Sequence, residues 1–134
     1  AMELSDGSVG TGKTKDLLGC ASAMLLNALK TLAGIPDEVK LIAERVIEPI
    51  QRLKVTSLHN RNPRLHTDEV LIALAICAVD DEFAARAIAQ LPRLKGLEAH
   101  ASVLLSPVDE DTFRRLGVNL TCQPKHETQR LFYR

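Results

Sequence analysis

Aromatic residues are scarce in this sequence. They make up 3% of its 134 residues and tryptophan is absent, whereas hydrophobic residues of all kinds make up 46%. A core without large rings must be built from Leu, Ile, Val and Ala. The length suits one compact domain, so we expect residues 1–134 to form a single unit.

An excess of charge of either sign is also missing. Lys plus Arg number 17 and Asp plus Glu number 17, which gives a net charge of zero. Nucleic-acid and anionic-membrane surfaces normally require a basic excess. No apolar run approaches the roughly 20 residues that span a bilayer, and the N-terminus has no basic and apolar secretion signal. We therefore expect a cytoplasmic protein that binds neither nucleic acid nor membrane.

Metal-binding and disulfide patterns are absent as well. Cys20, Cys77 and Cys122 are an odd number and form no CxxC pair, and Cys20 and Cys77 fall in apolar helical stretches, which predicts small core residues in a reducing compartment. The four histidines stand far apart and include no HExxH motif. The sequence therefore predicts no metal site.

The stretch from Gly7 to Thr14 fits the phosphate-loop pattern GxxxxGK[ST] at every fixed position. A true phosphate loop lies between a buried parallel strand and a helix, and it needs an acidic partner that holds Mg²⁺. A helical apolar pattern does follow Thr14. The nearest acidic partner is Asp109, which is offset from the apolar run before it.

The segment before Gly7 favours a different interpretation. Only six residues precede this glycine, and three of them are polar, whereas a buried parallel strand is apolar throughout. Asp6-Gly7 is a strong hairpin signal. We therefore predict antiparallel strands at Glu3–Ser5 and Ser8–Thr11. Gly12, Lys13 and Thr14 remain candidates for binding an anion at the start of the next helix.

Helical spacing of apolar residues predicts most of the remaining elements. A central helix is expected over Lys15–Ala33, ended by Gly34 and Pro36, and a short one over Asp37–Leu41. A helix over Glu44–Val55 contains Pro49, which costs nothing if the helix starts near Glu48 and kinks it if the helix starts at Ala43. Thr67 is expected to cap a helix whose body, Val70–Val79, is apolar almost all round and hence buried on most sides. Asp80-Asp81 begin the next helix, which Pro92 ends.

Two strands and a helix are expected near the C-terminus. Apolar and polar residues alternate over Leu97–Leu105, Ser106-Pro107 begins a helix, and Val118–Cys122 is a final strand. Together these elements predict an α+β fold. Its small mixed or antiparallel sheet would consist of the N-terminal hairpin and two C-terminal strands, packed with four to six helices.

Four stretches in the right order resemble the C-terminal part of the bacterial domain of unknown function 1846 family: Asp6–Pro36, Val46–Lys54, Asn62–Ile76 and Ala99–Pro124. Members of this family are several times longer, so the resemblance implies that the chain is the C-terminal domain of a larger protein. The family has no established activity. Its occasional description as an ATP-dependent zinc protease has no support in these residues beyond the phosphate-loop-like stretch.

Polar residues form two candidate sites outside that stretch. Arg64, His66 and Asp68 lie at an expected helix start, where they could bind an anionic ligand or simply cap the helix. His100 lies within the predicted Leu97–Leu105 strand and faces the same way as Glu98 and Ser102. No catalytic set or cofactor is identifiable.

We therefore carry two functions forward. One is a domain that completes a site or an interface with the rest of its own longer chain or with a second copy. The alternative is an ATP-binding or hydrolysing domain centred on Lys13.

Overall fold

The computed structural model describes residues 1–4, 9–10, 19–102 and 104–122. These residues contain five α-helices, one π-helical turn, one 3-10 turn and a four-stranded sheet. The helices and helical turns are α1 (Cys20–Ala33), α2 (Glu44–Arg52), η1 (Leu53–Ser57), α3 (Thr67–Cys77), α4 (Glu82–Ile88), η2 (Leu91–Leu94) and α5 (Pro107–Arg115). The strands are β1 (Met2–Glu3), β2 (Val9–Gly10), β3 (Glu98–Ala101) and β4 (Asn119–Cys122).

The sheet has the order β2-β1-β3-β4. β1 runs antiparallel to both of its neighbours, and Met2 lies opposite Gly10 on one side and Ala99 on the other. β3 and β4 are parallel and are connected through α5. The predicted α+β class and mixed sheet are thus confirmed.

β1 and β2 pair as the N-terminal hairpin interpretation requires, although each strand is shorter than predicted. Val9 and Gly10 lie in the middle of the phosphate-loop-like stretch, and a phosphate loop would have them curve around the phosphates. In the structure both residues pair with β1 instead. Gly12, Lys13 and Thr14 lie outside the described residues.

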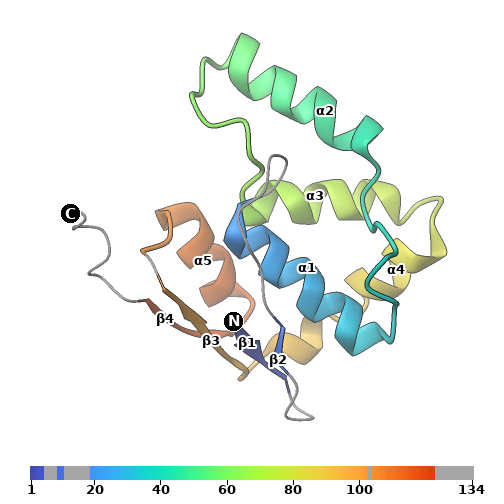
Figure 1. Cartoon of the computed structure of the whole chain (residues 1–134), viewed down its shortest axis with the longest axis vertical. Coiled ribbons are helices and arrows are strands. Elements are labelled where there is room, and N and C mark those ends of the chain that lie inside the picture. Colours follow the sequence, from blue (N-terminus) through green and yellow to red (C-terminus); the bar gives the residue numbers. More distant parts are fainter. Residues whose placement is uncertain (5–8, 11–18, 103, 123–134) are drawn as a thin grey trace.

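α1 is the central helix, as predicted. It lies in the middle of the molecule, with α3 on one side and the sheet on the other (Figure 1). It ends where the sequence indicates: Gly34 has a φ of 70°, and the N–H of Ile35 donates to the Lys30 carbonyl at 2.9 Å. The predicted start at Lys15 is wrong, because Gly19 is extended and the helix begins at Cys20. Cys20 and Cys77 are free thiols and are half-buried rather than core residues.

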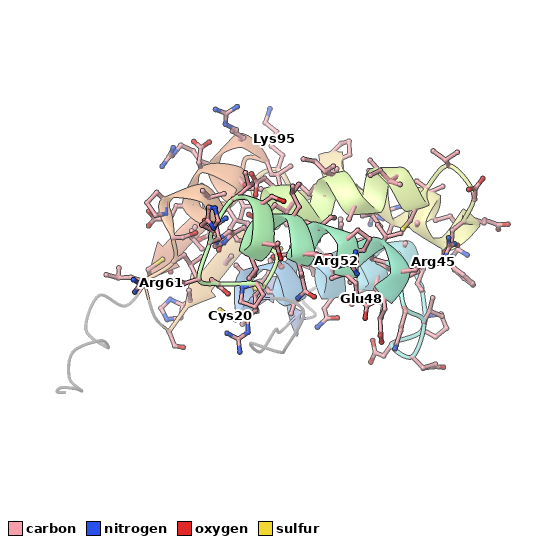
Figure 2. All side chains as sticks on the ribbon, turned by 90° about the horizontal axis from the view of Figure 1, so that it is seen from above. Cys20, Arg45, Glu48, Arg52, Arg61 and Lys95 are labelled. Atoms are coloured by element: carbon pink, nitrogen blue, oxygen red, sulfur yellow. The ribbon has the colours of Figure 1, made fainter. Side chains whose placement is uncertain are left out.

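The segment after α1 differs most from expectation. Asp37–Leu41 forms a turn without a helix. α2 starts at Glu44, so Pro49 lies inside it, and the chain then widens into the π-helical turn η1. Viewed from above, α2 carries Arg45, Glu48 and Arg52 on its exposed side (Figure 2). Only Ile47 of this helix is fully buried.

The C-terminal elements follow the predicted order. β3 covers only Glu98–Ala101 of the alternating stretch Leu97–Leu105, with Ala99 buried and its two neighbours exposed. Ser106 caps α5 by accepting a hydrogen bond from the Asp109 N–H at 3.2 Å. α4 ends at Ile88, before Pro92, which lies in η2.

Among the described residues, the core consists of aliphatic side chains together with Met2, Met24 and the completely buried Phe113. The sheet, α1 and α5 all contribute to this core. α3 adds Val70, Ala73 and Leu74, each of which is completely buried. None of the helices in the described part of the chain is both long enough and apolar enough to cross a membrane.

Gly117 joins α5 to β4 in a left-handed conformation, with a φ of 80°. A Cβ at this position would lie 2.9 Å from Lys95 Cγ and 3.3 Å from Lys95 Cα. Gly34 has a similar φ of 70° but nothing within 4 Å of a Cβ.

We expect Gly34→Ala to lower the free energy of unfolding by about 1 kcal/mol through backbone strain alone. Gly117→Ala should cost about 2 kcal/mol because a steric clash adds to that strain. Urea unfolding of both variants measures the difference, and equal losses would contradict the clash.

Candidate functional site

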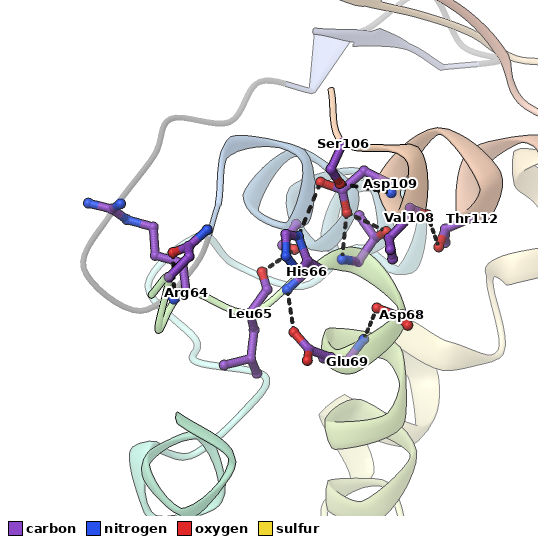
Figure 3. A network of polar contacts seen from close by, with 12 residues as sticks. Arg64, Leu65, His66, Asp68, Glu69, Ser106, Val108, Asp109 and Thr112 are labelled. Atoms are coloured by element: carbon purple, nitrogen blue, oxygen red, sulfur yellow. Dashed lines mark hydrogen bonds and ion pairs between the residues drawn. The ribbon is translucent and has the colours of Figure 1, made fainter. Parts of the chain in front are cut away.

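The starts of α3 and α5 meet at one point, where the carboxylate of Asp109 joins them (Figure 3). Its Oδ1 accepts hydrogen bonds from the Thr67 backbone N–H at 2.9 Å and from the Thr67 hydroxyl at 2.8 Å. Thr67 is completely buried, and Asp109 is nearly so. A negative charge is favourable at a helix N-terminus, so Asp109 both caps α3 and fixes α5 against it.

A second carboxylate holds the other side of the same helix start. Glu69 Oε1 accepts from the backbone N–H of His66 and from Lys54 Nζ, each at 2.8 Å. Lys54 comes from η1, and its ammonium also donates to the Arg64 carbonyl at 2.7 Å. Only 3% of Lys54 is exposed. This ion pair, in which Lys54 is buried and the Glu69 side chain is 26% exposed, connects η1, the 58–66 loop and α3.

His66 lies between these two carboxylates. It is the N-cap residue of α3, one position before the predicted Thr67, which is the first residue of the helix and donates its N–H and hydroxyl to Asp109. The His66 ring Nδ1 lies 3.7 Å from Asp109 Oδ2. That distance allows charge attraction when the imidazole is protonated but is too long for a hydrogen bond. About a third of the His66 side chain is exposed.

The backbone around His66 is fixed on both sides. Leu65 and Thr67 are completely buried. The Leu65 carbonyl accepts a hydrogen bond from Ser22 Oγ at 2.8 Å, which ties the loop to α1. We call the group Lys54, Arg64, His66, Thr67, Glu69, Ser106 and Asp109 the His66 cluster.

Three of the predicted site residues come together here. Arg64 precedes His66 by two positions and points away from the carboxylates (Figure 3). Asp68 accepts a hydrogen bond from the Glu69 N–H at 2.8 Å. The amides of His66 and Thr67, which an anion at this helix start would need, already donate to Glu69 and Asp109. A ligand would therefore meet the imidazole and guanidinium groups rather than the helix amides.

His100 lies elsewhere, on β3. Its Nδ1 is 2.9 Å from Thr121 Oγ1 on β4, so the ring is engaged across the sheet. A cavity of about 90 Å³ borders His100, Cys20 and Ser102. Within the described part of the chain, no three His, Cys, Asp or Glu side chains are grouped closely enough to hold a metal ion.

Only Arg64 and His66 of the His66 cluster were predicted as site residues, and Lys54 and Asp109 are among the members that lie far from them in the sequence. Lys54 continues the buried stripe of Ile47 and Ile50 at helical spacing, and a lysine at such a position indicates a buried partner. Asp109 was considered as an acidic partner of the phosphate-loop-like stretch, but its carboxylate accepts hydrogen bonds from Thr67, which lies 42 positions away in the sequence. No local pattern could show that contact.

The sequence from residue 1 to residue 132 matches the family model described as "Domain of unknown function DUF1846, C-terminal". It is 53% identical over 132 residues to "UPF0371 protein cu0538" of Corynebacterium urealyticum, covering 98% of this chain and 27% of the relative. It is similar over the same shares to "UPF0371 protein DIP2346" of Corynebacterium diphtheriae (54%) and "UPF0371 protein str1377" of Streptococcus thermophilus (47%). The chain thus spans about a quarter of the length of these curated relatives.

Proposed function

We propose, from the premise that this chain belongs to the DUF1846 C-terminal domain family, that it is one domain of a longer cytosolic protein and completes a site shared with another part of that protein. The observation that carries this proposal is how His66 is held at the surface of the domain. Its backbone is fixed, while its imidazole remains partly open to solvent.

The cost of this arrangement supports a role beyond capping. An ordinary Ser or Asp would cap α3 equally well. The His66 cluster instead contains the Lys54–Glu69 ion pair, whose carboxylate accepts the His66 N–H, and the Asp109 carboxylate, which binds the adjacent Thr67. Functional side chains are characteristically held in this way, by neighbours that are themselves fixed by packing and hydrogen bonds.

The chemistry available to His66 follows from its neighbours. Asp109 Oδ2 lies 3.7 Å from the ring Nδ1. A protonated ring can bind an anionic group or transfer a proton to it, and Arg64 adds a second cation on the same loop. We therefore propose an anionic ligand, held between this loop and a surface outside the domain.

The alternative, an ATP-binding domain centred on Lys13, needs a parallel strand leading into Gly7. The antiparallel pairing of β1 with β2 favours the shared site instead.

The shared site predicts that His66 is shielded in the longer protein. We expect diethyl pyrocarbonate to modify His66 readily in the 134-residue chain and several-fold more slowly in the full-length protein, with rates measured by peptide mass spectrometry. His100, which is bonded within the sheet, serves as the internal reference.

Denatured samples of both proteins provide the control, because all histidines should then react alike. Equal rates for native His66 in the two proteins would overturn the shared site.

A further inference from the structure

α3 exposes an apolar face that the described residues do not cover. Ile72, Ile76 and Val79 are 60%, 55% and 81% exposed, and Ala75 between them is also exposed. Their spacing of three or four residues places them on one side of the helix and its final turn. We call these four residues the α3 outer face.

The exposure of this face is unusual for a helix of such apolar composition. A helix that is apolar all round is normally buried all round. The inner side of α3 satisfies that rule, since Val70, Ala73 and Leu74 are completely buried. The outer face has the same composition without the burial, so a covering surface is expected.

Charges at the two ends of the face indicate what that surface is. Asp68 lies at its beginning, and Asp80, Asp81 and Glu82 lie at its end. A second copy would set acidic groups against acidic groups whether the two helices ran parallel or antiparallel, which is unfavourable. A heterologous surface with basic residues around an apolar centre fits better.

We propose that the α3 outer face docks onto the portion of the same polypeptide that precedes this domain in full-length members of the family. About three quarters of the length of the curated relatives lies outside the matched region, and the matched family model is the C-terminal one. This proposal rests on the proposed function in one respect, namely that the chain is a domain of a longer protein. It names a surface separate from the His66 cluster.

The test compares side-chain labelling in two proteins. Hydroxyl-radical footprinting should label Ile72 and Ile76 several-fold less in the full-length protein than in the 134-residue chain. Leu53 is a matched reference because it is 52% exposed and lies outside both this face and the 58–66 loop; its labelling should change little. Equal labelling of Ile72 and Ile76 in the two proteins would overturn the proposal.

Variants of the full-length protein test the contact energetically. Burying one aliphatic side chain corresponds to roughly a tenfold change in a binding constant. Ile72→Ser/Ile76→Ser should therefore make this domain and the remainder of the protein melt at separate temperatures, whereas Leu53→Ser should not. Charge reversal by Asp80→Lys/Glu82→Lys should weaken the same coupling. Unchanged melting in the double Ser variant would overturn the proposal.

Sedimentation of the 134-residue chain tests the competing occupant. A monomer is expected. A dimer that Ile76→Asp dissociates would identify a second copy on this face and overturn the proposal. If Ile72 and Ile76 are labelled equally in the two proteins while His66 is shielded in the full-length protein, only the docking surface is overturned. If Ile72 and Ile76 are protected while His66 is not shielded, only the shared site is overturned.

Discussion

Replacement of Glu69 by alanine should lower the free energy of unfolding by about 3–5 kcal/mol, because it leaves the Lys54 ammonium buried without its counter-charge. The same change removes the acceptor of the His66 N–H. Urea unfolding monitored by circular dichroism measures the loss.

Two further variants show whether this loss belongs to the buried pair. Glu44 forms an ion pair with Lys40 at 3.3 Å, but both side chains are well exposed. Glu44→Ala should therefore cost less than about 1 kcal/mol. Lys54→Met/Glu69→Gln removes both charges and keeps an acceptor for His66, so it should recover much of the stability that Glu69→Ala loses. No recovery in the double variant would contradict a buried charge as the cause.

Replacement of Asp109 by alanine should cost about 2–4 kcal/mol, because the N–H and hydroxyl of Thr67 both lose a charged acceptor in a fully buried position. Asp111 provides a control within the same helix. It pairs with Arg114 at 3.0 Å and Arg115 at 2.7 Å on the surface, so Asp111→Ala should cost less than about 1 kcal/mol.

The Thr67 side of the contact can be tested separately. Thr67→Val keeps the shape of the residue and removes only the hydroxyl, so it should cost about 1–2 kcal/mol. Its effect should be largely absent when Asp109 is already alanine, since the acceptor is gone. Urea unfolding of the two single variants and the double variant gives this coupling, and fully additive losses would contradict a direct bond.

Local signals in the sequence were sufficient for much of the fold. The Ser106-Pro107 helix start, the Gly34 helix end and the β1–β2 hairpin each depend on residues adjacent in the chain, and each is present in the structure. The alternation from Leu97 identified β3, although neither end of the strand could be fixed by alternation alone.

Errors arose where distant contacts override local preference. Thr67 is an excellent N-cap residue by type, yet it is the first residue of α3, where its N–H and hydroxyl donate to Asp109, and His66 is the N-cap residue. Arg64 and His66 of the candidate site were predictable, since they lie next to an expected helix start in the sequence. Lys54 and Asp109 were not, because tertiary packing alone brings them to the start of α3.

The position of β1 inside the sheet covers one side of β3, to which a strand of another chain could otherwise pair. β1 lies between β2 and β3, and the backbone of His100 continues the same pairing by exchanging hydrogen bonds with Ala1 at 2.7 Å. Without β1, one side of β3 would present unpaired N–H and C=O groups on a strand with alternating apolar residues. Such an edge is a template on which another chain can add a strand, so β1 removes this template from β3 as it completes the sheet.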